Sequence, residues 1–264
     1  MNTVIDFQTP DEVSDYVRSV PADDFYILGR GSNSLINPDS IVPTVIRMAA
    51  DAVVPEINGT RVRLGAGMPM NRLQDFALKQ GLSGLEFAAG VPASLGGMVA
   101  MNFGCWGRSM SDFVTGIQVV DDRGEIRWLT VDAAQFSYRT SVFHQKKWMV
   151  VAAELELTTS DSETVRTAML ANIHTRIEKQ PLRDKTFGSI FKNPPGHYAA
   201  QLLESAGLKG RQWGAIQLSD RHANFLLNSG GARYSDTIQV LELLRSTVQS
   251  VANIELELEV KIFK

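Results

Sequence analysis

The stretch "TFGSIFKNPPG", residues 186–196, places one hydroxyl among residue types that could take part in a reaction. Ser189 lies between a glycine and an apolar pair, and Lys192 and Asn193 follow that pair directly. A hydroxyl can donate a proton, but serine is a very weak acid, so neighbouring dipoles or cations must assist. Taken alone, the stretch favours a turn hydroxyl beside a strand.

A first glycine-rich segment, "LGRGSNSLINP" (residues 28–38), follows a strand signal. Its serines, asparagines and proline favour turns, so it cannot open into the helix that a dinucleotide-binding fingerprint requires. Consecutive backbone N–H groups in such a loop can instead form a concave nest for an anion, and Ser32 and Asn33 would add side-chain donors. A surface loop between two strands is the alternative interpretation.

A second segment, "GLEFAAGVPASLGGMVAMNFGCWG" (residues 84–107), places several glycines among apolar residues. Such glycines permit close backbone approach or positive φ, and a flat apolar ligand that bears phosphates would use both properties. Tight packing of two core elements would explain the same composition. Two glycine-rich segments in one half of the chain nevertheless favour a phosphorylated ligand.

Strand and helix signals alternate along the chain and predict an α+β fold. Thr9 to Glu12 form a capping box with proline at the first helical position, which predicts a helix through about Val20. The other elements expected in this part are a strand at "FYILG", a helix at "NRLQDFALKQ" closed by Gly81, and strands "TGIQVVDD" and "EIRWLTV" in a hairpin. A polar helix follows "WMVVAAELELTT" and stops at Pro181, where we expect the main domain boundary.

The last part predicts a helix over "YAAQLLESA", strands "AIQLS" and "ANFLLN", and a long helix from Ser235. Four residues of that helix share one apolar face, namely Val240, Leu244, Val248 and Val251. The final "IELELEVKIF" alternates strictly and predicts one strand. Its charged face carries Glu255, Glu257, Glu259 and Lys261, which the period alone interprets as exposed to solvent.

Composition excludes several classes of protein. The chain has 264 residues, 44% of them hydrophobic, which is enough for a substantial core. Apolar runs are shorter than the roughly 20 residues of a membrane helix, and no signal peptide is recognised, so we expect a cytoplasmic protein without a membrane partner. The net charge of −3 without a long basic run argues against nucleic-acid binding. Cys105 is the only cysteine, so neither an internal disulfide nor a cysteine-based zinc site is expected, and no metal is predicted.

The chain resembles the UDP-N-acetylenolpyruvoylglucosamine reductase family from about Phe25 to the end, through motifs that occur in the family's order. Besides the glycine-rich segments, these are "SYRTSVF", "GSIFKNPPGHYAAQLLESAGLKG", "SDRHANFLLN" and "LELEV". The resemblance implies NADPH-dependent reduction of UDP-N-acetylglucosamine enolpyruvate to UDP-N-acetylmuramate in peptidoglycan precursor synthesis, the activity of a UDP-N-acetylmuramate dehydrogenase. The short span between "SYRTSVF" and "GSIFKNP" indicates the shorter family type, which lacks an extra substrate-capping loop.

The resemblance also implies an FAD-binding domain of the vanillyl-alcohol-oxidase (PCMH) type with a C-terminal α+β substrate-binding domain. We place the FAD-binding domain at residues 1–180, with subdomains at about 1–48 and 49–160, and the substrate-binding domain at 181–255. Whether the last strand, 256–264, returns to the FAD-binding domain is left open. We expect a monomer that acts on a small sugar nucleotide.

The same resemblance implies roles for individual residues. Ser189 would donate a proton to the substrate, Arg139 would bind the substrate carboxylate through its guanidinium fork, and Glu259 would be the third catalytic residue. An arginine is more commonly part of a surface ion pair, and a lone histidine more commonly structural. The expected substrate-binding residues are Lys192, Asn193, Lys209 and His222. The expected FAD-binding residues are Gly29, Arg30, Gly31, Ser32, Asn33, Gly90, Val91, Pro92, Ser94, Gly96, Gly97, Asn102 and Gly104.

Two alternatives to this reductase stay open. The first is a flavoprotein of the same fold that acts on a different substrate, and the second is a non-catalytic member that has lost flavin binding. Family members commonly have glycine at the position of Arg30, which would either add a phosphate contact or crowd the loop.

Overall fold

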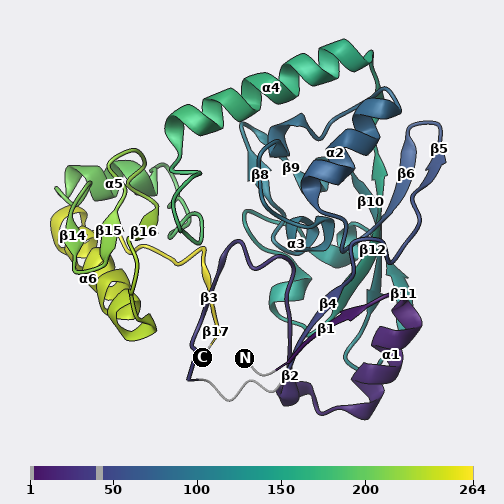
Figure 1. Cartoon of the computed structure of the whole chain (residues 1–264), viewed down its shortest axis with the longest axis horizontal. Helices are drawn as coiled ribbons and strands as arrows, with labels where there is room; N and C mark the ends of the chain where they lie inside the picture. The colour runs from purple at the N-terminus through teal and green to yellow at the C-terminus, as the bar shows by residue number, and fades with distance from the viewer. Residues whose placement is uncertain (1–2, 40–43, 264) are drawn as a thin grey trace. The chain divides into compact units, whose positions relative to one another are not determined.

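A computed structural model of the chain describes residues 3–39 and 44–263 (Figure 1). It contains two compact units, each of which is discontinuous in sequence. The first consists of Met1–Arg30 and Ile41–Ile173, and the second of Gly31–Ser40 and His174–Lys264. The division therefore falls inside the first glycine-rich segment and inside the helix α4, Ser162–Lys179. The domain boundary at 180 stays a prediction.

The first unit begins with a three-stranded parallel sheet in the order β1-β4-β2. Its strands are β1 (Thr3–Phe7), β4 (Thr44–Met48) and β2 (Phe25–Ile27), and α1 (Pro10–Ser19) follows β1. The predicted capping box is confirmed, because the Thr9 hydroxyl accepts from the Glu12 amide at 3.2 Å while the Glu12 carboxylate accepts from the Thr9 amide at 3.3 Å.

An antiparallel sheet of five strands forms the centre of the first unit, in the order β11-β10-β12-β6-β5. The strands are β11 (Ile126–Leu129), β10 (Val114–Val120), β12 (Met149–Glu156), β6 (Arg61–Gly65) and β5 (Glu56–Asn58). The predicted hairpin is confirmed by the antiparallel register of Val120 with Ile126. In Figure 1, α2 (Met70–Lys79) and α3 (Leu95–Ala100) lie against this sheet, and their apolar residues share one buried cluster with it.

Shorter elements complete the first unit. The strands are β7 (Leu82–Ser83), β8 (Gly104–Cys105), β9 (Arg108–Ser109) and β13 (Thr158–Thr159). Turns of 3-10 helix occur at Ala22–Asp24, Glu86–Ala88, Met110–Asp112, Asp132–Ala134 and Val142–His144. Of all the helices in the described residues, none is long and apolar enough to cross a membrane.

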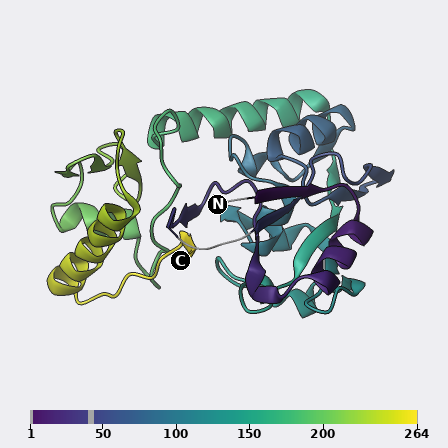
Figure 2. The same ribbon diagram turned by 60° about the horizontal axis from the view of Figure 1, so that its bottom comes forward.

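The second unit packs two helices against a small antiparallel sheet, ordered β14-β15-β16 (Figure 2). The elements are α5 (Ala199–Ser205), β14 (Gln212–Trp213), β15 (Ile216–Leu218), β16 (Leu226–Asn228) and α6 (Tyr234–Ala252). Leu244 and Val248 are buried as predicted, and so is Val240. The prediction for Val251 was wrong: it is 62% exposed, because the last turn of α6 extends past the buried cluster.

The continuous strand predicted over residues 254–263 was also wrong. Only β17 (Lys261–Phe263) is a regular strand, and it pairs in parallel with β3 (Ser34–Ile36). The preceding residues pair with a different segment through an isolated bridge between Leu258 and Phe191. The segment changes partner between these two contacts, so one uninterrupted ladder cannot form.

Candidate active site

The two glycine-rich segments meet in the first unit. A Cβ atom on Gly29 would lie 2.9 Å from the Ser94 hydroxyl oxygen and 3.5 Å from the Gly97 Cα. Ser94 is buried and precedes α3 directly. Residues far apart in the sequence therefore lie so close together that any side chain at position 29 would collide with Ser94. The absence of a side chain at position 29 thus lets the two glycine-rich segments approach closely, and Ser94 and Gly97 fill the space beside Gly29.

Other predicted cofactor residues differ in their surroundings. A Cβ on Gly96 would meet the Ala66 Cβ at 2.8 Å, and one on Gly104 would meet the Arg108 carbonyl oxygen at 2.7 Å, so both glycines permit close packing within the protein. Gly90 has φ of 80° and is exposed together with Pro92, while Val91 is half-buried. The exposed residues of this segment are therefore Gly90 and Pro92 near its middle and Trp106 and Gly107 at its end.

The rest of the first glycine-rich segment, from Gly31, belongs to the second unit, where Asn33 makes two side-chain hydrogen bonds. Its side-chain nitrogen donates to the carbonyl oxygens of Phe187 and Ser189 at 3.0 Å and 3.1 Å. Its Oδ1 atom is buried, yet no donor within residues 3–39 and 44–263 bonds to it. Gly31 has φ of 69°, Ser32 is half-buried and Arg30 is exposed. Buried polar atoms are nearly always hydrogen-bonded, so this acceptor needs a donor from a water or a ligand.

Ser189 and Glu259 lie on neighbouring segments of the second unit. The amide of Glu259 donates to the carbonyl oxygen of Ile190, the residue after Ser189, at 2.8 Å. Ser189 also forms an isolated bridge with Phe225, and its hydroxyl makes no hydrogen bond to any described residue. Glu259 is half-buried, whereas Glu257 on the same period-two face is exposed. The segments that carry the two predicted catalytic residues are thus neighbours. Glu259 is less exposed than the period-two alternation of its segment predicted.

Asn224 was missed by the sequence reasoning. It is 5% exposed, and its side-chain amide donates to the carbonyl of Phe191 at 2.8 Å and accepts from the amide of Phe191 at 3.0 Å. Its own carbonyl accepts from the Ile190 amide at 2.9 Å. The amide thereby substitutes for a strand partner beside Ser189. An asparagine inside the apolar run "HANFLLN" was the available signal.

Arg139 belongs to the first unit and lies in a tight turn, where its φ is 54°. The guanidinium carbon is 5.2 Å from the centroid of the Phe103 ring and 5.4 Å from that of the Tyr138 ring. Rings at these distances attract a cation and restrict its orientation. Arg139 therefore presents an ordered guanidinium.

The predicted substrate-binding residues of the second unit already have protein partners. Lys192 pairs with Glu257 at 2.5 Å, and Lys209 pairs with Glu204 at 2.9 Å. The Asn193 side-chain oxygen accepts from the amide of Ala199, the first residue of α5, at 3.0 Å. These contacts fix the side chains, and the two lysines would exchange a partly exposed carboxylate for a substrate anion.

His222 is surrounded by protein. Its Nδ1 atom accepts from the Asn224 amide at 3.2 Å, and its ring meets that of Phe225 edge-on with centroids 4.9 Å apart. Burial lowers the pKa of His222 below the ordinary value of 6.5, and the charge of Lys209 lowers it further. A neutral imidazole with this tautomer can still donate from Nε2.

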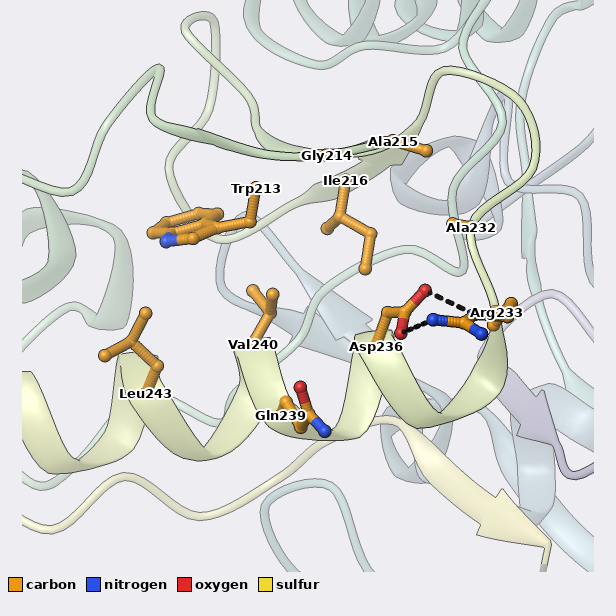
Figure 3. A pocket seen from close by; sticks show the side chains of 10 residues that line it. All are labelled: Trp213, Gly214, Ala215, Ile216, Ala232, Arg233, Asp236, Gln239, Val240 and Leu243. Atoms are coloured by element: carbon orange, nitrogen blue, oxygen red, sulfur yellow. Dashed lines mark hydrogen bonds and ion pairs between the residues drawn. The ribbon is translucent and has the colours of Figure 1, made fainter.

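A separate pocket of about 410 Å³ lies between α6 and the β14–β15 hairpin (Figure 3). Trp213 covers one end opposite Leu243, and the ion pair between Arg233 and Asp236 borders the other. Its lining includes none of the predicted site residues.

Comparison with known proteins first defines the class. The model of an FAD binding domain matches residues 2–130, and that of the C-terminal domain of UDP-N-acetylenolpyruvoylglucosamine reductase matches residues 180–263. The chain is thus an FAD-binding protein with a reductase-type C-terminal domain.

The particular family follows from individual relatives. UDP-N-acetylenolpyruvoylglucosamine reductases from Halalkalibacterium halodurans and Bacillus subtilis are each 39% identical to it, over 89% of this chain and 78% of theirs. The crystal structure of the enzyme from Thermus caldophilus matches with a TM-score of 0.83 and 31% identity, over 99% of this chain and 91% of that one. The chain belongs to the UDP-N-acetylenolpyruvoylglucosamine reductase family, as its motifs predicted.

Proposed function

We propose that the protein is an FAD-dependent reductase that uses NADPH to convert UDP-N-acetylglucosamine enolpyruvate into UDP-N-acetylmuramate for peptidoglycan synthesis. Family membership supports the activity. One observation supports the activity at the level of residues. Ser189 lies beside Glu259, and the Ser189 hydroxyl makes no hydrogen bond to any residue that the structure describes. We keep the FAD-binding domain at residues 1–180 and the substrate-binding domain at 181–255 as the proposed division.

We assign FAD to the place where the two glycine-rich segments meet, around Gly29 and Gly97, and to the nearby residues 90–92 of the second segment. Backbone amides of residues 29–33 would hold the diphosphate. Because diphosphate oxygens only accept, the unfilled Asn33 Oδ1 would take its hydrogen bond from a hydroxyl of the cofactor. When bound, FAD supplies the electrons that it receives from NADPH to the enolpyruvyl double bond. The protein contributes binding, orientation and proton delivery.

Ser189 delivers the proton in this proposal. Reduction of the double bond leaves negative charge on the carbon beside the substrate carboxylate, and that carbon must take up a proton. Because the Ser189 hydroxyl has no acceptor among the described residues, it can turn toward this carbon. The backbone around it is fixed by Asn33 and Asn224, so the donor has little orientational freedom to lose.

Arg139 and Glu259 are the other two residues that we assign to the reaction, in which negative charge develops on the substrate. The ordered guanidinium of Arg139 offers two parallel hydrogen bonds to the substrate carboxylate as negative charge spreads onto it. Glu259 is half-buried on the segment whose amide bonds to Ile190, next to Ser189, and we keep it as the third catalytic residue. Lys192, Asn193, Lys209 and His222 contact the carboxylate or diphosphate region.

The absorption spectrum of the purified protein tests the proposal. We expect a yellow protein whose flavin band is bleached by NADPH and recovers when the enolpyruvyl sugar nucleotide is added. Bleaching without recovery would favour a flavoprotein that acts on a different substrate. Absence of flavin after reconstitution would favour a non-catalytic member of the family.

We further propose that the protein acts as a monomer in the cytoplasm, without a nucleic-acid or membrane partner. Sedimentation at micromolar concentration tests the monomer, and fractionation of cells that express the chain tests the location.

A further inference from the structure

We propose that Asn102 is a positioning residue for Arg139, because its side-chain amide fixes the turn from which the guanidinium binds the substrate carboxylate. The inference rests on the proposed function of Arg139. The sequence suggested a cofactor contact for Asn102, and we assign its side-chain amide to the Arg139 turn.

The turn that carries Arg139 is closed at its base. Ser137 and Thr140 exchange two backbone hydrogen bonds, of 3.1 Å and 3.2 Å, so Tyr138 and Arg139 form a two-residue loop. Arg139 has φ of 54°, in the left-handed region that arginine rarely occupies. A residue keeps such a conformation only when its surroundings determine it. The anchors of this turn therefore decide where the guanidinium lies.

Asn102 supplies the first anchor. It is 6% exposed, and its Nδ2 atom donates to the carbonyl oxygen of Ser137 at 3.0 Å. Its Oδ1 atom accepts from the backbone amide of Ser111 at 3.0 Å. Both polar atoms of the side chain are thus bonded to protein, and the amide connects the base of the Arg139 turn to a second backbone segment.

Two neighbours of Asn102 complete the support. The hydroxyl of Ser141, which is 2% exposed, donates to the carbonyl oxygen of Ala100 at 2.5 Å, on the other side of the turn. Phe103 provides one of the rings beside the guanidinium, and its own ring stacks on Phe87 with centroids 6.1 Å apart. Residues 100–103 therefore hold the turn at both flanks and hold the cation itself.

This arrangement exceeds what a structural turn needs. A glycine or asparagine at position 139 would adopt the left-handed conformation with less strain. The chain instead places a cation there, between Phe103 and Tyr138, although Tyr138 is 52% exposed. A guanidinium with fixed orientation suits a carboxylate that must be bound through two parallel hydrogen bonds.

Asn102→Asp tests the anchor with almost no change in size. The carboxylate still accepts from the Ser111 amide, but an oxygen replaces the donor opposite the Ser137 carbonyl. A displaced catalytic group commonly costs about 10²-fold, so we expect kcat/KM for the enolpyruvyl substrate to fall by about that factor. Flavin content and the rate of flavin reduction by NADPH should change less than about twofold.

Asn172→Asp is the matched control. Asn172 lies in the same unit, and its side-chain nitrogen donates to the Glu86 carbonyl oxygen at 2.9 Å. This variant should keep wild-type kcat/KM. An equal loss in both variants, or an unchanged kcat/KM in Asn102→Asp, would overturn the proposal.

A double variant separates positioning from general damage. If Asn102 acts through Arg139, Asn102→Asp should cause no further loss in kcat/KM when Arg139 is already alanine. If the fold-losses of kcat/KM in the two single variants multiplied in the double variant, the proposal would be contradicted. If Asn102→Asp does not fold, Ser141→Ala is used instead, because it removes the hydrogen bond on the other side of the turn. It is then combined with Arg139→Ala in the same double-mutant comparison.

A measurement without substrate distinguishes this inference from the proposed function. Hydrogen exchange at the Thr140 amide, which bonds to the Ser137 carbonyl, should accelerate in Asn102→Asp and not in Asn172→Asp. Unchanged exchange would sink the positioning role even in a fully active enzyme. A wild-type protein that does not reduce the enolpyruvyl substrate would instead contradict the proposed function.

Discussion

The side-chain nitrogen of Asn33 donates a 3.1 Å hydrogen bond to the carbonyl oxygen of Ser189. The same nitrogen bonds to Phe187, so the proposed proton donor is fastened to the loop assigned to the flavin diphosphate. A change in that loop should therefore reach Ser189 through a single side chain.

Ser189→Ala should leave flavin binding and flavin reduction by NADPH largely intact while slowing the reaction with the enolpyruvyl substrate by about 10²–10⁴-fold. The reason is that only the second half-reaction needs a proton at the substrate carbon. Stopped-flow absorption of each half-reaction measures the difference. Ser189→Cys should retain part of the rate, because a thiol also donates. Equal slowing of both halves would indicate damaged cofactor geometry.

Asn33→Ala removes two hydrogen bonds from the segment that carries Ser189. Each contributes about 0.5–1.5 kcal/mol, so we expect the free energy of unfolding to fall by about 1–3 kcal/mol and FAD to bind more weakly. Urea denaturation and flavin fluorescence titration measure the two effects. Gln217→Ala is the control, since its amide also donates to a carbonyl in the same unit, that of Gly210 at 3.3 Å. Loss of FAD affinity in the control as well would speak against a specific role of Asn33.

Gly29→Ala introduces a Cβ 2.9 Å from the Ser94 oxygen. Overpacking costs about 1–3 kcal/mol, and each 1.4 kcal/mol is about tenfold in affinity, so we expect FAD to bind about 5- to 150-fold more weakly. Ser94→Ala in the same chain removes the colliding oxygen and should recover part of the loss. Gly116→Ala, where the nearest atoms lie at 3.4 Å, should bind FAD normally. Unaltered affinity in Gly29→Ala would place the cofactor elsewhere.

His222 should make the stability of the protein depend on pH. Its pKa is lowered in the folded state, chiefly by burial, while the unfolded chain keeps the ordinary value of 6.5. The unfolded state therefore binds more protons below about pH 6.5, and stability falls as the pH decreases from about 6.5 toward the lowered pKa of the folded state. Urea unfolding of His222→Gln should show a smaller loss over this range. His174→Gln, which changes an imidazole that is 75% exposed, should behave as wild type.

Local signals were sufficient for most helices and one hairpin. Thr9 and Glu12 specify the start of α1 through their own hydrogen bonds, and Gly81 ends α2 with φ of 63°. Such features depend on neighbours in the sequence. They could therefore be predicted without knowing the fold.

Long-range contacts could not be predicted in the same way. The alternation of residues 254–263 is compatible with one strand, and only the positions of Phe191 and β3 divide it between two partners. The contact of Gly29 with Gly97 and the amide clamps of Asn102 and Asn224 equally need the folded chain. The motif order indicated which segments matter, while pairing across more than a hundred residues determines what each side chain touches.

The pairing of β3 with β17 has a consequence for biosynthesis. Lys261 and Ser34 are partners in register, so a ribosome completes the second unit only after it has made residues at both ends of this sequence. Loop closure over such a separation is entropically costly and slow. The loop around Asn33 therefore lacks its β17 partner, and stays exposed, during most of translation. Nascent chains stalled before Ile262 should be attacked by protease around residues 31–39, and released chains that contain β17 should not.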